Sequence, residues 1–247
     1  MTTQSELTIV IPAKNEARLI PRLLTSLTNQ DYSRMSSTRV LVADADSTDG
    51  TPEIVMRFCD RLNVGVIKGG MPAYGRNQGA AQADTPYVLF LDADIELADH
   101  SLIRRCMEKA QTRQLHCVTT NILCKDGTWV DKLLYAGNDF FQYLSYLHRP
   151  FATGMFMLFN RRKFWEFGGF HEKIQFAEDY RLSQRVQRKR FSIVRGGVFT
   201  TNRRFQRMGH LRVGWLFLWT AMNFWNERHF LRDHKYWANE ADSLPRA

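Results

Sequence analysis

The sequence predicts an α/β fold in which a mostly parallel sheet is flanked by helices. Short apolar runs alternate with segments whose apolar residues recur at helical spacing, as parallel strands and crossover helices require. The most informative run is Tyr87–Leu91, which has the length of a buried strand and leads directly into Asp92 and Asp94. Ligands of open α/β sheets bind at the carboxyl ends of strands, so these aspartates lie where a binding site is expected.

The first part of the chain follows this alternation closely. We predict strands at 7–11, 39–43, 64–68 and 87–91. We predict helices that begin at Asn15 and Glu16, at Thr51 as an N-cap with Pro52 behind it, and at Tyr74. The third helix is rich in small residues and is expected to lie close to the sheet. This alternation of strand and helix implies a parallel sheet with right-handed crossovers.

The second part of the chain alternates less regularly. We predict helices at 101–112, 128–147, 177–189 and 211–231, and strands at 116–123, 155–159, 191–194 and 198–201. Gly168 and Gly169 are expected to break the chain before Phe170. The sequence contains no internal repeat, low-complexity tract or linker that would mark a second independent domain.

Positive charge is concentrated in one segment. The 247 residues carry a net charge of +9, yet residues 181–212 contain ten Lys or Arg and no Asp or Glu. Such a segment needs an anionic partner: a phosphate-bearing substrate, a membrane surface or nucleic acid. The four cysteines form no C-x-x-C pair and no signal peptide is recognised, so we expect reduced thiols in a cytoplasmic protein.

Six short motifs occur in one order with ordinary spacings. They are Ile11-Pro12-Ala13-Lys14-Asn15-Glu16, Asp44 with Ser47-Thr48-Asp49-Gly50-Thr51, Gly75-Arg76-Asn77-Gln78-Gly79, Asp92-Ala93-Asp94, Gly168-Gly169-Phe170 and Glu178-Asp179. Over roughly residues 7–205 the sequence resembles the family 2 glycosyltransferases of GT-A fold. The resemblance implies a nucleotide-diphosphate-sugar donor, with a UDP-sugar favoured, a divalent metal (Mn²⁺ or Mg²⁺), and inversion at the anomeric carbon.

The resemblance implies that the donor nucleoside lies on the loops after the first two strands. Asp44 ends the second strand, where a carboxylate can accept the imide hydrogen of a uracil. Ala45 and Asp46 replace a second Asp and a Gly that are common in the family, which leaves the base open. Ser47, Thr48 and Thr51 are interpreted as a turn and helix cap. Four residues at the end of the first strand and in the loop after it are also assigned to donor binding: Pro12, Ala13, Asn15 and Glu16.

Arg76 and Asn77 are also assigned to donor binding. They follow a glycine-bearing loop and are expected to open a helix. A cation at a helix N-terminus is unfavourable for the helix dipole unless an anion is bound there. This favours contact of Arg76 with a diphosphate or a base over a solvated surface arginine.

The two aspartates after the fourth strand are the candidate metal site. Asp94 resembles the metal ligand of the family. Asp92 resembles the neighbouring aspartate, which contacts the ribose or a metal-bound water. Asp-x-Asp alone equally suits a turn that ends a strand. A metal would offset the negative charge of the departing diphosphate as a Lewis acid. Arg203, Arg204 and Arg207 fall where related enzymes carry a basic element near the diphosphate, so Arg204 and Arg207 are assigned to the donor.

Glu178 and Asp179 are the candidate catalytic pair. An inverting transfer needs one carboxylate to take the proton of the acceptor hydroxyl as it attacks. Acidic residues in a first helical turn also suit the helix dipole without any catalytic role. We favour Asp179 as the base and Glu178 as an orienting or acceptor-binding group.

These assignments predict one GT-A domain followed by a tail. We expect a donor half over about 1–98, an acceptor half over about 99–210, and a helical tail over 211–247. A Rossmann dehydrogenase is discounted because no G-x-G-x-x-G follows the first strand. A rival of another class is a degenerate transferase core that serves as a membrane- or nucleic-acid-binding module. Intact acids at 94 and 179 argue against it, and no nucleic acid partner is expected.

The predicted cellular location depends on the C-terminal tail. The segment 213–225 carries no charge, and its thirteen residues are too few to span a bilayer, which needs about 20. It either packs back on the aromatic segment 128–147 or docks on an anionic membrane, which we favour because basic residues precede it. Docking would place the protein peripherally on the inner face of the cell membrane, near a lipid-linked glycan or glycolipid acceptor. Processive polysaccharide synthesis is not supported, because Gln206-Arg207-Met208 lacks the spacing and the Trp of a Q-x-x-R-W element.

Overall fold

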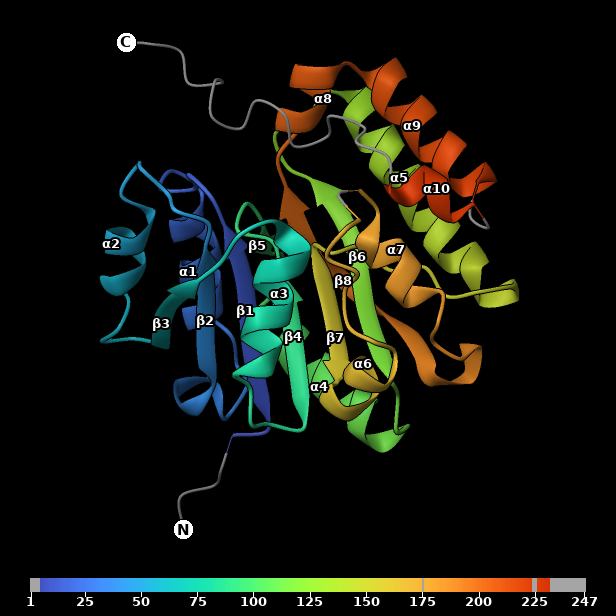
Figure 1. The fold of residues 1–247 in the computed structure, drawn as a ribbon. Helices are drawn as coiled ribbons and strands as arrows, with labels where there is room; N and C mark the ends of the chain where they lie inside the picture. Colours follow the sequence, from blue (N-terminus) through green and yellow to red (C-terminus); the bar gives the residue numbers. More distant parts are fainter. Residues whose placement is uncertain (1–4, 175, 224–225, 232–247) are drawn as a thin grey trace.

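A single mixed sheet organises the protein. The computed structural model describes residues 5–174, 176–223 and 226–231 (Figure 1). Within these residues the strands form one sheet in the order β3-β2-β1-β4-β7-β6-β8-β5. The strands are β1 (Leu7–Ala13), β2 (Arg39–Asp44), β3 (Asn63–Lys68), β4 (Tyr87–Leu91), β5 (Glu96–Leu97), β6 (Cys117–Cys124), β7 (Phe156–Asn160) and β8 (Phe191–Thr200).

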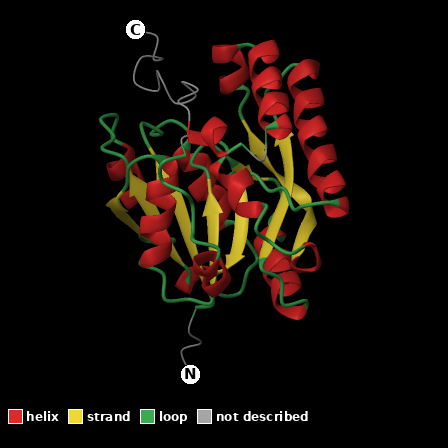
Figure 2. Ribbon diagram, turned by 45° about the vertical axis from the view of Figure 1, so that its right-hand side comes forward, coloured by secondary structure: helices red, strands yellow, loops and turns green. Residues whose placement is uncertain are grey.

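Helices cover both faces of this sheet (Figures 1 and 2). They are α1 (Ile20–Thr28), α2 (Thr51–Met56), α3 (Pro72–Ala81), α4 (Leu102–Thr112), α5 (Trp129–Leu144), α6 (Arg161–Glu166), α7 (Glu178–Ser183), α8 (Arg203–Met208), α9 (His210–Met222) and α10 (Glu227–Leu231). The predicted α/β class with a mostly parallel sheet is confirmed. The sequence analysis missed β5, α6 and α8, each six residues or shorter.

The strands of the first part of the chain are parallel, as predicted. β1 pairs with β2 and β4, and β2 pairs with β3, all in parallel register. The second part departs from this, because β7 is antiparallel to both β4 and β6, and β5 is antiparallel to β8. A strand buried on both faces is a continuous apolar run in either direction, so the pattern does not encode its polarity.

Alternate residues of β1 build two cores. Leu7, Ile9 and Ile11 pack with α1, α2 and α4 on one face, whereas Val10 packs toward α3 on the other. The close approach of α3 was predicted, and its cause is Gly79. A Cβ at that position would lie only 2.3 Å from Cγ1 of Val10. Any larger residue would push α3 away from the sheet.

The first helix begins later than predicted, and the second begins one residue earlier. α1 begins at Ile20 rather than at Asn15 and Glu16, because Asn15 has a left-handed backbone with φ of 53°. The N-cap of α2 is Gly50, with φ of 86°, and Thr51 is the first helical residue. The Thr51 hydroxyl instead accepts the backbone N–H of Glu16 at 2.9 Å. The loops after β1 and β2 are therefore tied to each other.

Three further predictions need correction in the second part of the chain. The predicted helix at 177–189 is only α7, and the two short strands at 191–201 are the single strand β8. β8 stays continuous because Gly196 absorbs a bend with φ of 138° that other residues rarely adopt. The predicted helix at 211–231 is interrupted after Met222 and resumes as α10.

The C-terminal helices pack beside α5 at one end of the molecule (Figures 1 and 2). Val213 and Thr220 of α9 are buried, and α9 contacts α5, so the described part of this segment does pack on 128–147, which was the alternative to the favoured membrane docking. Asp131 of α5 connects this helix to the start of α9, because His210 Nε2 lies 2.7 Å from one of its oxygens. Burial alone would raise the pKa of Asp131, but hydrogen bonds from His210, Asn202 and Thr128 lower it to about 2. Phe224, Trp225 and residues 232–247 of the predicted tail lie outside the described residues.

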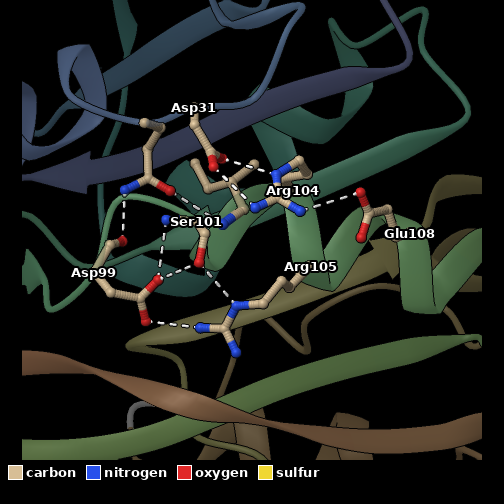
Figure 3. A network of polar contacts seen from close by, with 8 residues as sticks. Asp31, Asp99, Ser101, Arg104, Arg105 and Glu108 are labelled. Atoms are coloured by element: carbon tan, nitrogen blue, oxygen red, sulfur yellow. Dashed lines mark hydrogen bonds and ion pairs between the residues drawn. The ribbon is translucent and has the colours of Figure 1, made fainter.

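A polar network ties α4 to the loops around it (Figure 3). Arg104 binds both carboxylate oxygens of Asp31, at 3.1 and 2.9 Å, and reaches Glu108 at 3.4 Å. Arg105 binds Asp99 at 2.7 Å. About 40% of the Arg104 side chain remains in contact with solvent, so this network is a surface one.

Candidate functional site

The candidate site lies where β1, β2 and β4 end. Parallel strands bring their carboxyl ends to one edge of the sheet, which places Asp44, Asp92 and Asp94 at that edge. One oxygen of Asp44 accepts the backbone N–H of Ser47 at 3.0 Å. Its other oxygen, Oδ1, is buried and has no hydrogen-bond partner among the described residues. A buried carboxylate oxygen without a partner is suited to accept a donor from a ligand.

The backbone after β1 lines the same edge. Ala13 and Glu16 are buried, whereas Pro12 and Asn15 are half-buried. Asn15 and Glu16 donate their N–H groups to Ser47 and Thr51 in the loop after β2. This arrangement brings four predicted donor-binding residues beside Asp44, through contacts between segments that lie 32 and 35 residues apart.

Arg76 links the two acidic motifs of the site. Its Nη2 lies 2.5 Å from Asp92 Oδ1 and its Nη1 lies 2.7 Å from Glu178 Oε1. Only 3% of the side chain is exposed, and although burial alone would lower its pKa, the neighbouring carboxylates raise it. Arg76 lies inside α3, which begins at Pro72, so the prediction that it opens a helix was wrong. Met71 to Gly75 complete the first turn instead.

The guanidinium also faces the backbone of Gly154. A Cβ at Gly154 would lie 2.7 Å from Arg76 Nη2 and 3.4 Å from Asp179 Oδ2. Only a glycine therefore allows the arginine and the aspartate to approach this backbone together. Arg76 Nε is buried and has no hydrogen-bond partner within the described part of the chain.

Asp179 is held as a half-buried carboxylate at the start of α7. Its Oδ2 accepts the N–H of Gly154 at 2.5 Å and its Oδ1 accepts the N–H of Tyr180 at 2.7 Å. Burial and the neighbouring charge of Glu178 raise the pKa of Asp179 to about 6. A carboxylate with a pKa near neutrality can take up a proton at physiological pH and return it to water afterwards. Glu178 differs, because its carboxylate is paired with Arg76.

Asn77 uses its side chain within the protein. Its amide nitrogen donates to the carbonyl oxygen of Phe170 at 2.8 Å and to Glu172 at 2.9 Å. Its amide oxygen accepts the N–H of Phe170 at 3.0 Å. Asn77 therefore fastens α3 to the chain that follows Gly168 and Gly169, both of which have left-handed backbones.

We expect Asn77→Ala to lower the free energy of unfolding by about 2 kcal/mol, because it leaves the buried backbone groups of Phe170 unpaired. Urea denaturation would measure the change. Gln82→Ala is the matched control, because Gln82 is exposed just after the same helix. Equal stability of the two variants would show that the Asn77 contacts do not hold this loop.

A small cavity joins the acidic and basic residues of the site. It has a volume of about 30 Å³, and its lining includes Asp92, Asp94, Arg203, Arg204 and Arg207. Arg203 lies 2.6 Å from Glu16 and 3.3 Å from Asp94. Carboxylates beside guanidinium groups suit a ligand that carries both a cation and phosphates.

The residues at the end of β4 fit part of a divalent metal site. Burial and the charge of Asp92 raise the pKa of Asp94, and a bound cation would relieve that repulsion. The described residues contain no group of three or more His, Cys, Asp or Glu placed to hold a metal. Asp94 and Asp92 would therefore share the ion with phosphate oxygens and water, as hard cations often do. The Asp94 side chain is 22% exposed, so a ligand in the cavity can reach it.

The structure adds residues that sequence reasoning missed. Gly154 supplies the N–H that holds Asp179, and Tyr135 and Thr201 line the small cavity. Gly154 precedes a strand and Tyr135 lies in an aromatic helix, so neither position carried a recognisable signal. Arg203 was noted with the basic element near the diphosphate but was not assigned to the donor.

A larger hollow lies elsewhere. It has a volume of about 640 Å³ and is lined by residues of α1 and β5 and by the two polar loops that carry Asp99 and Lys125. Its buried polar groups, such as Ser26 and Gln30, already bind protein atoms. The chemistry is therefore concentrated in the small cavity and not in the large hollow.

Comparison with known proteins agrees with this geometry. The profile of the family described as Glycosyl transferase family 2 matches residues 8–168, which include β1, β4 and the Asp92-Ala93-Asp94 turn. The chain belongs to this family. The matched segment ends at Gly168, before the Glu178-Asp179 pair, so the base assignment rests on the geometry described above.

Characterised relatives of this family 2 glycosyltransferase share parts of its sequence. Poly(ribitol-phosphate) β-N-acetylglucosaminyltransferase TarS of Staphylococcus aureus is 36% identical over 90 residues, which cover 35% of this chain and 16% of TarS. GalNAc(5)-diNAcBac-PP-undecaprenol β-1,3-glucosyltransferase of Campylobacter jejuni is 30% identical over 129 residues, which cover 49% of this chain and 40% of that enzyme. The chain thus spans less than half the length of either relative.

Solved structures confirm the GT-A fold class. TarS of S. aureus in complex with UDP-GlcNAc aligns with a TM-score of 0.64 at 19% identity, over 80% of this chain and 58% of that one. The mannosyltransferase PcManGT of Pyrobaculum calidifontis, in complex with GDP-Man and Mn²⁺, aligns with a TM-score of 0.63 at 22% identity, over 85% and 63%. At these identities the likeness establishes the fold.

Proposed function

We propose that this protein transfers a sugar from a nucleotide-diphosphate-sugar, with a UDP-sugar favoured, to an acceptor hydroxyl with inversion at the anomeric carbon. One observation carries the proposal. Asp179, a half-buried carboxylate whose pKa is raised to about 6, lies one arginine away from the Asp92-Ala93-Asp94 turn. A base for the acceptor and a site for the donor diphosphate therefore face each other across Arg76.

The donor half of this site has a group for each part of the nucleotide. The unpartnered oxygen of Asp44 is the acceptor for the imide of the base, with Pro12, Ala13, Asn15 and Glu16 along the nucleoside. Asp92 and Asp94 would hold a divalent cation, which supplies Lewis-acid stabilisation to the diphosphate when bound. Arg204 and Arg207 line the same cavity and would contact the phosphates.

A single base is sufficient for the transfer. Asp179 accepts the proton of the acceptor hydroxyl as its oxygen bonds to the anomeric carbon, and the bond from that carbon to the diphosphate oxygen breaks. Negative charge passes to the nucleoside diphosphate, beside the guanidinium groups. Arg76 keeps Glu178 in place as an orienting group, because the two are joined at 2.7 Å. The same ion pair leaves Asp179 as the carboxylate able to accept a proton.

The acceptor is proposed to be a lipid-linked glycan or a glycolipid. The C. jejuni relative is named for an undecaprenol-linked glycan, whereas TarS is named for a poly(ribitol-phosphate). The alternative is a degenerate core that only binds a membrane or nucleic acid. The intact Asp94 and Asp179, and the arginine that joins the two halves of the site, favour the enzyme.

The donor assignment is tested by calorimetry with UDP-, GDP-, dTDP- and CDP-sugars, each with and without Mn²⁺. We expect a UDP-sugar to bind most tightly and Mn²⁺ to strengthen that binding. Asp94→Ala is expected to abolish the Mn²⁺-dependent part while the thermal unfolding transition is retained, because the side chain lies partly exposed at the end of β4.

Asp60→Ala is the matched control, since it removes an exposed carboxylate next to α2. The control should bind the donor with Mn²⁺ as the natural protein does. Unchanged Mn²⁺-dependent affinity in Asp94→Ala would refute the metal assignment. Binding of no nucleotide-sugar by the natural protein would refute the transferase.

A further inference from the structure

The outward faces of α5 and α9 are apolar, which is the reverse of an ordinary surface helix. On α5 the exposed residues include Trp129, at 75% exposure, with Leu133, Phe140 and Leu144. On α9 they include Leu211, at 90% exposure, with Trp215, Leu218 and Met222. Both sets recur at intervals of three to seven residues, so each forms a stripe along one side of its helix.

The inward side of α5 carries polar residues, together with Tyr135, which packs against the core. The buried residues of this helix are Asp131 and Gln142, and Asp139 is half-buried and accepts the N–H of Ile122 at 3.0 Å. A helix in water turns its polar side outward. α5 is inverted, so its outer side is suited to an apolar environment.

The two helices lie side by side at one end of the molecule (Figures 1 and 2). The rings of Trp215 and Trp219 stack on α9 with centroids 5.9 Å apart. Tryptophan is favoured at the boundary between lipid and water. No helix among the described residues is long and apolar enough to cross a bilayer, so these helices could enter only the interface.

We propose that α5 and α9 together form a docking surface, the α5–α9 surface, for a membrane that contains anionic lipids. The positive charge of this surface favours an anionic membrane as the occupant. The exposed charged side chains on the two helices are Lys132 and Arg212, whereas Asp131 is buried. A second copy of the chain would bring these like charges together, and the segment 232–247 is too polar in sequence to supply an apolar cover.

The surface is continuous with the proposed site. Phe217 of α9 contacts Phe176, just before Glu178, with ring centroids 5.9 Å apart. Tyr135 of α5 lines the small cavity with Asp92 and Asp94. Docking would therefore hold the catalytic residues close to the membrane, where a lipid-linked acceptor would present its hydroxyl. This consequence rests on the proposed function, but the docking itself does not.

Sedimentation of the full chain with vesicles, without donor, tests the proposal. Vesicles of phosphatidylcholine are compared with vesicles that also contain phosphatidylglycerol, at low and high salt. We expect binding to the anionic vesicles and weaker binding at high salt. The double variants Trp215→Glu with Leu218→Glu, and Trp129→Glu with Leu133→Glu, are each expected to lose it. Met56→Glu is the matched control, because Met56 is 46% exposed on α2.

A second pair of variants separates charge from apolar contact. Lys132→Gln with Arg212→Gln should weaken partitioning to anionic vesicles by about fivefold for each cation removed. Arg57→Gln with Arg113→Gln removes two exposed cations just after α2 and α4 and should leave it unchanged. Calorimetric donor binding, measured on the same samples, verifies that each variant is folded and reports on the proposed function separately.

Three results would overturn the proposal. They are equal binding to neutral and anionic vesicles, unchanged binding of the helix variants, and a dimer that the same substitutions dissociate while no vesicle is bound. Sedimentation velocity detects the dimer. Failure of vesicle binding with intact donor binding would reject the membrane surface alone, and the converse result would reject the transferase alone.

Discussion

Replacing Asp179 with Asn is expected to lower kcat by about 10²–10⁴-fold, because the amide cannot accept the proton of the acceptor hydroxyl. Donor binding should persist, since the hydrogen bonds of Asp179 to Gly154 and Tyr180 do not involve the donor cavity. Turnover of a UDP-sugar with an acceptor, together with calorimetric donor affinity, would measure both effects. Asp126→Asn is the matched control, because Asp126 is an exposed carboxylate in the loop between β6 and α5.

The pH profile gives an independent check of the same residue. Burial and Glu178 raise the pKa of Asp179 to about 6, so the carboxyl is protonated and inactive as a base below that pH. We therefore expect kcat/KM to rise with pH through about 6 and the rise to vanish in Asp179→Asn. A variant that keeps the natural rate, or the same ascending limb, would place the base elsewhere.

Replacing Arg76 with Gln is expected to lower the free energy of unfolding by about 3–5 kcal/mol. The substitution removes the cation between Asp92 and Glu178, and breaking a buried ion pair leaves an uncompensated buried charge. Urea denaturation would measure the loss. Adding Glu178→Gln to the variant should recover part of it, because one of the two stranded carboxylates is then neutral.

Arg104→Gln is the matched control for the buried arginine. Arg104 also joins two carboxylates, Asp31 and Glu108, but its side chain is 40% exposed (Figure 3). Surface ion pairs contribute about 0–1 kcal/mol, because water already solvates both charges. If the two variants lost the same free energy of unfolding, burial would not make the ion pairs of Arg76 more stabilising than the surface pairs of Arg104.

The elements that form the nucleotide edge could be predicted from the sequence. The strands β1 to β4 agree with their predicted ranges within two residues, because each is a short apolar run bounded by turn residues. The second part was harder to predict. Apolar runs there did not show that β7 is antiparallel, and the predicted break between two strands was a bend at Gly196 within β8.

The candidate site was predictable in its members but not in its connections. Asp44, Asp92 and Asp94 each end a strand, and strands of one parallel sheet end at one edge. Arg76 was predicted to stand at a helix N-terminus, near an anion. Its place inside α3 depends on Pro72 as an early helical residue, and its partner Glu178 lies 102 residues away. No local pattern encodes a contact of that range.

The sequence by itself determined the α/β class, the family and the acids at the nucleotide edge, because strand length, chain order and turn chemistry are local properties. Only the tertiary structure decided that Arg76 is buried between Asp92 and Glu178, that Gly154 holds Asp179, and that the apolar side of α5 points outward. Helical periodicity shows which residues share a face. Which face meets the protein depends on what packs against it, and here β6 and α9 meet the side that carries Asp131 and Gln142.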